Sequence, residues 1–120
     1  MKPVLSDSGF GSITVDGREI GHDIIIRLSG EISKRRKDLS KAIFGTSHII
    51  SGEEAEYVYQ DGASGLIIGA GQEGMVRLSE EATDYFTKRK CTVELCPTPK
   101  AIEKWNRTNE AVIGLFHITC

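Results

Sequence analysis

The sequence predicts an α/β domain in which a strand-rich first third precedes alternating strands and helices. Asp16-Gly17 is a dipeptide that favours the type I′ turn of a β-hairpin, because both positions accept a positive φ. Ser51 and Ser79 each stand where a helix N-cap is expected. Residues 111–118 are apolar on both faces of an extended chain, which is typical of a strand in the middle of a covered sheet.

The first third is expected to form short antiparallel strands around the Asp16-Gly17 turn, with a further turn at Ser29-Gly30. The expected strands are residues 10–15, 18–20 and 24–26. Residues 31–44 are ambiguous. Ile32, Arg36, Leu39 and Ile43 would share one helical stripe. The family resemblance given below implies an extended chain here instead.

The remaining two thirds alternate between helices and strands. Acidic residues fill the first turn of the helix after Ser79, and basic residues fill its last turn, as the helix dipole favours. Thr98 is expected to cap the last helix, with Pro99 at its first position. The expected helices are residues 53–60, 80–90 and 99–107, and the expected strands are residues 66–68, 91–95 and 111–118.

Length and composition predict one domain spanning residues 1–120. Hydrophobic residues make up 39% of the chain, so a packed core is expected and disorder is not. The net charge of -2 argues against a dedicated nucleic-acid binder, which usually carries a strong positive balance.

Three cysteines, Cys91, Cys96 and Cys120, form an odd set without CxxC spacing. The first ten residues lack the apolar run of a secretory signal, and no apolar stretch is long enough to span a membrane. We therefore expect a reduced, cytoplasmic protein without a membrane partner.

The most distinctive motif is a GxGxxG pattern that directly follows a predicted strand, and it consists of Gly69, Ala70, Gly71, Gln72, Glu73 and Gly74. In a dinucleotide site the glycines open the next helix, so that its N–H groups point at the pyrophosphate. Here the helix cap is Ser79, so the helix begins too late. The main expectation is a structural turn against neighbouring backbone, and the alternative is a cradle of backbone amides for a small anion or phosphate.

Other candidate groups carry weaker signals. His117 and Cys120 would point to opposite faces of a strand, so a Cys-His nucleophile pair is not expected. No histidine and cysteine set has metal-site spacing, and we expect neither a metal nor another cofactor.

The basic cluster at residues 34–37, with Lys41 nearby, is interpreted as a solvated face whose best functional alternative is protein docking. Acid pairs such as Glu53-Glu54 are attributed to helix capping.

Three segments together resemble one protein family. They are Phe10-Gly-Ser-Ile with Asp23-Ile-Ile-Ile, Leu66-Ile-Ile-Gly-Ala-Gly-Gln, and Thr98-Pro-Lys-Ala-Ile with the ending Leu115-Phe-His-Ile-Thr-Cys120. They resemble the small domain-of-unknown-function family that includes the adipogenesis-associated domain-containing protein and the mitochondrial complex I assembly factor 3. The resemblance implies a three-layer fold: a central mixed sheet flanked by helices, with N-terminal β structure on one side. It also implies a last strand inside the sheet and antiparallel to its neighbours.

The resemblance brings no enzyme activity with it. We therefore expect a non-enzymatic protein-interaction or assembly-factor-like domain with an unidentified protein partner. No catalytic residue is predicted. The alternative is a protein, or an enzyme of unrecognised activity, that binds a small anion or phosphate-containing ligand at the loop of residues 69–74.

Overall fold

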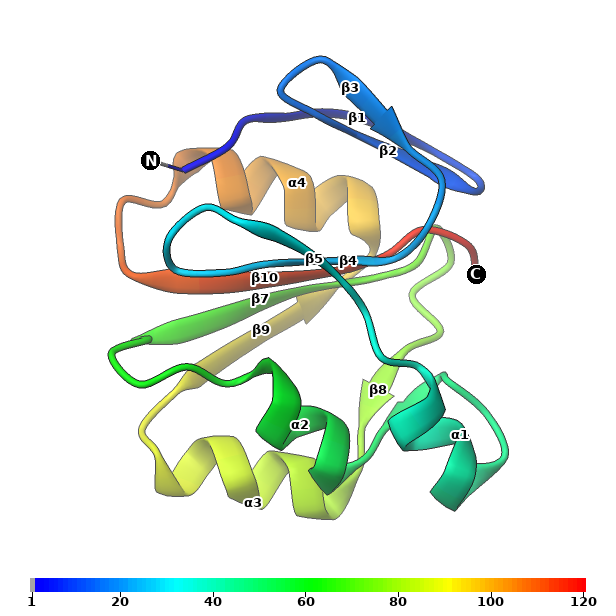
Figure 1. The fold of residues 1–120 in the computed structure, drawn as a ribbon, viewed down its shortest axis with the longest axis vertical. Coiled ribbons are helices and arrows are strands. Elements are labelled where there is room, and N and C mark those ends of the chain that lie inside the picture. The colour runs from blue at the N-terminus through cyan, green and yellow to red at the C-terminus, as the bar shows by residue number, and fades with distance from the viewer. Residues whose placement is uncertain (1) are drawn as a thin grey trace.

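A central five-stranded sheet organises the molecule, and the computed structural model describes it within residues 2–120 (Figure 1). The strands lie in the order β5-β4-β10-β7-β9. Their bounds are β4 (Ile24–Ile26), β5 (Ile32–Lys34), β7 (Gly65–Ala70), β9 (Thr92–Cys96) and β10 (Val112–His117).

Two smaller sheets and four helices complete the described chain. An antiparallel sheet contains β1 (Leu5–Gly9), β2 (Ser12–Val15) and β3 (Arg18–Ile20), and a parallel pair joins β6 (Ile49–Ile50) to β8 (Arg77–Leu78). The helices are α1 (Asp38–Phe44), α2 (Gly52–Val58), α3 (Glu80–Lys88) and α4 (Thr98–Arg107). Within residues 2–120, none of them combines the length and apolar character needed to cross a membrane.

The strand β10 occupies the middle of the main sheet, as its two-sided apolar pattern predicts. It runs antiparallel to β4, with Leu115 opposite Ile25, and parallel to β7, with Leu115 opposite Ile68. The expectation that β10 is antiparallel to its neighbours is therefore correct for β4 and wrong for β7. The helical crossovers after β7 explain the difference, because they return the chain in the same direction.

Helices and the small sheet cover the two faces of the main sheet, which gives the expected three-layer α/β fold (Figure 1). On one face, Ile113 and Leu115 pack with residues of α2 and α3, including Phe86. On the other face, Phe116 packs with Trp105 of α4, and this core continues to residues of β1 and β2. Successive side chains of β10 point to opposite faces of the sheet, so this strand contributes residues to both cores.

Local signals account for most element boundaries. The side chains of Ser51 and Ser79 accept the capping hydrogen bonds of α2 and α3, as predicted. Thr98 instead belongs to the first turn of α4, and its hydroxyl bonds elsewhere, so its prediction as a cap is wrong. The ambiguous residues 31–44 hold both alternatives, β5 followed by the helix α1. Asp16 and Gly17 adopt positive φ between β2 and β3, as the hairpin prediction requires.

Candidate functional site

A buried ionic network lies where β4, α1, α2 and the end of β10 meet. At its centre is Arg35, whose side chain is fully buried. Its guanidinium donates to Asp23 Oδ2 at 3.0 Å, to Glu54 Oε2 at 2.6 Å and to the Ser47 carbonyl at 2.7 Å. These carboxylates compensate the positive charge that burial would otherwise disfavour, and they raise the pKa of the guanidinium despite burial. The prediction that the basic residues 34–37 form a solvated face is therefore wrong for Arg35.

Glu54 is also fully buried, although the sequence suggested only a capping role. Its carboxylate accepts from Arg35 and from the Ser40 hydroxyl, while its backbone N–H donates to the Ser51 side chain. Ser40 is the buried residue of α1, so polar contacts hold this short helix against α2. Removing one member would leave a buried charge unpaired, which is costly in a medium of low dielectric.

Asp23 links the arginine to His117, which is 1% exposed. The distance from Asp23 Oδ2 to His117 Nδ1 is 2.7 Å, and the backbone N–H of Ile118 donates to Asp23 Oδ1 at 3.0 Å. Burial alone would raise the pKa of Asp23, but the hydrogen bond and charge of His117, the Ile118 amide and the Arg35 charge together lower it to about 2. The carboxylate is therefore ionised at neutral pH.

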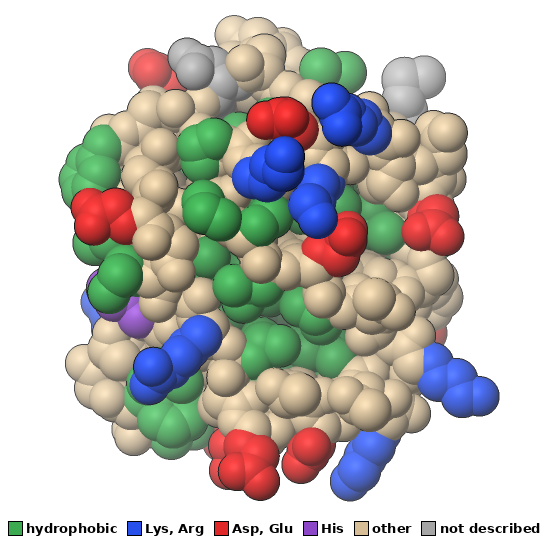
Figure 2. Space-filling model, turned by 180° about the vertical axis from the view of Figure 1, so that it is seen from behind, with side chains coloured by type: hydrophobic (Ala, Val, Ile, Leu, Met, Phe, Trp, Pro, Cys, Tyr) green, Lys and Arg blue, Asp and Glu red, His purple; other side chains and the backbone are tan. Residues whose placement is uncertain are grey.

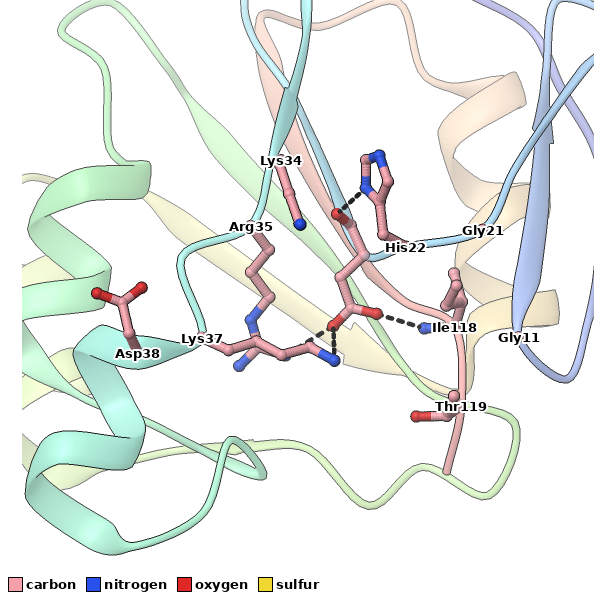
Figure 3. A pocket seen from close by; sticks show the side chains of 10 residues that line it. Gly11, Gly21, His22, Lys34, Arg35, Lys37, Asp38, Ile118 and Thr119 are labelled. Atoms are coloured by element: carbon pink, nitrogen blue, oxygen red, sulfur yellow. Dashed lines mark hydrogen bonds and ion pairs between the residues drawn. The ribbon is translucent and has the colours of Figure 1, made fainter.

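The other ring nitrogen of His117 extends the network toward the surface. Its Nε2 lies 3.1 Å from the hydroxyl of Thr119, which is partly exposed. Thr119 and Asp23 both line a cleft of about 460 Å³, together with Lys34 and Lys37. Figure 3 shows Lys34, Lys37 and Thr119 around the cleft. The Lys37 ammonium lies 3.6 Å from Asp23 Oδ2. The cleft therefore places the Thr119 hydroxyl near two ammonium groups and the carboxylates of Asp23 and Asp38. The buried His117 imidazole connects Asp23 to Thr119.

The predicted glycine loop lies against the last residues of the chain. The backbone N–H of Gln72 donates to the Thr119 carbonyl at 2.7 Å, and those of Glu73 and Met75 donate to the Cys120 carbonyl at 3.3 and 3.2 Å. The N–H of Gly71 donates to the Thr98 hydroxyl, which in turn donates to the His117 carbonyl.

The remaining loop amides are also engaged. Gly74 donates to the Gly71 carbonyl, and Val76 donates to the Ala70 carbonyl. Ala70 and Gly69 belong to β7, beside His117 and Phe116 of β10. An anion that used the amides of this loop would have to replace the contacts with the C-terminal residues. Ligand binding by the loop thus remains a prediction that requires the C-terminal residues to move.

Cysteine and metal chemistry have little support from the geometry. Cys91, Cys96 and Cys120 are all free thiols, and burial raises the pKa of the Cys91 thiol. A raised pKa keeps the thiol protonated and less nucleophilic. Among the side chains that the structure describes, no group of three or more His, Cys, Asp or Glu is placed to hold a metal ion.

A second feature is the open edge of the main sheet at β9. Among residues 2–120, no strand lies beyond β9 in the order of the sheet. A groove of about 530 Å³ runs beside the strand, with Phe86, Val93 and Leu95 in its lining. On the face shown in Figure 2, apolar side chains gather across the middle, with charged side chains above and below. Leu95 is 39% exposed.

The backbone of β9 offers hydrogen-bonding groups along this edge. The N–H of Thr92 donates to the Ser64 carbonyl, so it faces the neighbouring strand β7. Because successive residues of a strand point their backbone groups in opposite directions, Val93 and Leu95 direct theirs outward. An edge with outward N–H and C=O groups is a template for another extended segment.

Comparison with known proteins gives the family. The family model described as "Protein of unknown function (DUF498/DUF598)" matches residues 5–117. The chain belongs to this family. The family is one whose function is unknown, which agrees with the expected resemblance to a domain-of-unknown-function family. No curated protein matches the chain.

Solved structures of similar proteins share the fold over nearly the whole chain. The conserved hypothetical protein PH1505 from Pyrococcus horikoshii OT3 is 30% identical, with a TM-score of 0.87 over 97% of this chain and 98% of that chain. The structure of MT938 is 32% identical, with a TM-score of 0.82 over 99% of this chain and 100% of that chain. A Mth938-like domain from Bordetella pertussis is 14% identical, with a TM-score of 0.69 over 97% of this chain and 85% of that chain.

Sequence reasoning missed most of the polar network. Arg35 was interpreted as part of a solvated basic face and Glu54 as a helix-capping acid, and Asp23 was given no role of its own. One signal was available: His117 and Thr119 are two residues apart, and such residues share one face of an extended chain. Asp23 comes from a segment 94 positions away from His117, and no local pattern brings the two together.

Proposed function

We propose that this protein is an interaction domain, in the manner of an assembly factor, and that it binds an extended segment of a partner protein along β9. The observation that carries the proposal is the open edge of β9 with a partly apolar groove beside it. Strand addition to such an edge takes its affinity from backbone hydrogen bonds and its specificity from side-chain pockets.

The geometry specifies the chemistry of the partner segment. Its backbone would pair with the outward groups of Val93 and Leu95, and every second side chain would enter the groove beside Phe86. The side chains that meet Phe86, Val93 and Leu95 should be apolar, while Lys90 and three threonines make the rest of the lining polar. We further propose a cytoplasmic location, which suits a chain with three free thiols.

The test is affinity capture from the cells in which the protein is naturally expressed, with variants that address the edge directly. Val93→Pro removes an outward N–H without touching the bonds to β7, and Leu95→Glu places a charge in the groove. Met75→Glu is the matched control, because Met75 is a similarly exposed apolar residue, 51% exposed, outside the groove. Partners bound by the unmodified protein and by Met75→Glu should be lost from both edge variants. Partners retained by both edge variants would refute docking at β9.

A second candidate function is binding of a small anion, and a specific observation favours it at a place other than the glycine loop. Lys34, Lys37 and His22 line the cleft of about 460 Å³ next to Thr119. Two ammonium groups on one concave surface attract a carboxylate or phosphate. Calorimetric titration with inorganic phosphate and with succinate tests this, and Lys34→Gln should weaken any binding that is found.

A further inference from the structure

The groups Asp23, His117 and Thr119 form a continuous carboxylate–imidazole–hydroxyl chain. The two links are 2.7 Å from Asp23 Oδ2 to His117 Nδ1 and 3.1 Å from His117 Nε2 to Thr119 Oγ1. This is the order of groups that activates a hydroxyl for nucleophilic attack, in which a base contacts the hydroxyl and a third group orients the base.

The ionised carboxylate of Asp23 fixes the direction of the hydrogen bond at His117 Nδ1. Asp23 is ionised and can only accept, so His117 Nδ1 must carry the proton that bridges them. Arg35, 3.5 Å from the same nitrogen, has no acceptor and directs its Nη1 to Asp23 instead. In the neutral imidazole this leaves Nε2 without a proton, and Nε2 therefore accepts from the Thr119 hydroxyl. That tautomer is the one a general base requires.

The hydroxyl is accessible whereas the base is not. Thr119 is partly exposed and lines the cleft, while His117 and Asp23 are 1% and 3% exposed. Lys37 and Lys34 line the same cleft, as Figure 3 shows. One ammonium can stabilise the oxyanion that develops on the carbonyl oxygen of the substrate when the hydroxyl attacks, and the other can bind an anionic end of the same small molecule.

We propose that Thr119 is a nucleophile and that the cleft hydrolyses small esters whose acyl part carries a carboxylate. Thr119 Oγ1 bonds to the acyl carbon while its proton moves to His117 Nε2. The bond to the leaving alcohol then breaks, and the alcohol takes that proton. Water next attacks the acyl-threonine and gives a proton to Nε2, which returns it to Thr119 Oγ1 as the acid leaves. The proposal is independent of strand docking at β9, and its acidic substrate would occupy the same cleft as the proposed anion.

The first experiment asks whether Thr119 reacts covalently. The full chain is incubated with a fluorophosphonate, and the labelled residue is located by mass spectrometry. Labelling is expected at Thr119, because His117 Nε2 can accept the proton of its hydroxyl. Thr119→Ser should keep the labelling and Thr119→Val should lose it. Thr14→Val, which removes a hydroxyl from β2 outside the cleft, is the matched control.

The second experiment measures turnover with two chromogenic esters, 4-nitrophenyl acetate and mono-4-nitrophenyl succinate. We expect a kcat/KM at least tenfold higher for the anionic ester in the unmodified protein. Lys34→Gln should reduce that preference by raising KM for the succinate ester only. Folding of each variant is verified by circular dichroism, and phosphate binding is measured in parallel, so that loss of chemistry is distinguished from loss of anion binding.

Each outcome bears on the proposal. Labelling at Thr119 with turnover that requires its hydroxyl supports a nucleophile. Absence of labelling at Thr119 in the folded protein, or hydrolysis that persists in Thr119→Val, overturns it and leaves the chain of hydrogen bonds as a structural clamp for the C-terminal residues. Equal kcat/KM for the two esters overturns the assignment of an anionic acyl group.

Discussion

Replacing Gly71 by alanine tests how tightly the glycine loop is fitted to the C-terminal residues. Gly71 has a φ of 97°, in the region that residues with a Cβ rarely adopt. A Cβ at this position would overlap the carbonyl carbon of Cys120, and it would lie 2.5 Å from the Cys120 oxygen and 2.9 Å from His117 Cδ2. Backbone and ring on two sides leave the methyl group no room, so the C-terminal residues must move away.

The expected cost follows from the contacts that would be lost. The unfavourable φ costs about 1 kcal/mol. Displacing the C-terminal residues breaks the bonds from Gln72, Glu73 and Met75 to the carbonyls of Thr119 and Cys120, at about 0.5–1 kcal/mol each for partly exposed bonds. The sum is roughly 3 kcal/mol. With a urea m-value of about 1.5 kcal/mol/M, the unfolding midpoint should fall by about 2 M.

Gly74→Ala is the matched control for this measurement. Gly74 also has a positive φ, 68°, but a Cβ there would meet only Pro97, at 3.4 Å. Gly74→Ala should therefore lower the free energy of unfolding only through its unfavourable φ, by roughly 1 kcal/mol. Urea unfolding followed by circular dichroism measures both variants. Equal losses for the two variants would refute the steric argument and show that the C-terminal residues contribute little to stability.

Two further predictions concern the buried network. Because the pKa of Asp23 is lowered to about 2 from 3.8, its charge stabilises the folded state above pH 4, and about 2 kcal/mol of unfolding free energy should be lost as the pH falls from 4 to 2. Asp23→Asn should flatten this part of the stability profile measured by urea unfolding, and an unchanged slope would contradict the assignment. Glu54→Gln removes a buried partner of Arg35 and should cost about 3 kcal/mol, whereas exposed Glu53→Gln should change stability by less than about 0.5 kcal/mol. Similar thermal unfolding of these two variants would show that the Arg35–Glu54 pair contributes little.

The sequence predicts those parts of the molecule that short-range patterns control. The caps at Ser51 and Ser79, the Asp16-Gly17 hairpin and the central position of β10 all follow from local chemistry or from alternation along one strand. The class of fold follows from the order of these elements. The direction of β10 relative to β7 does not, because pairing of distant strands depends on how the whole chain is connected.

The candidate site was harder to predict because its members come from distant segments. Arg35 stands in a run of four basic residues, and nothing within that run distinguishes it from its exposed neighbours Lys34 and Arg36. Its burial depends on acceptors supplied by Asp23, next to β4, and by α2. Glu54 likewise shares its helix turn with exposed Glu53, and only the partner across the interface separates the two roles.

The central position of β10 also governs the order in which the molecule can assemble. Its neighbours β4 and β7 are synthesised long before residues 112–117, and they are not adjacent to each other in the finished sheet. Until β10 emerges from the ribosome, the edges of both strands that face it have no partner. The three-layer core therefore closes only after translation of nearly all 120 residues, through pairings such as Gly114 with Ile26. Such late, long-range closure predicts slow folding and a nascent chain that benefits from protection against aggregation.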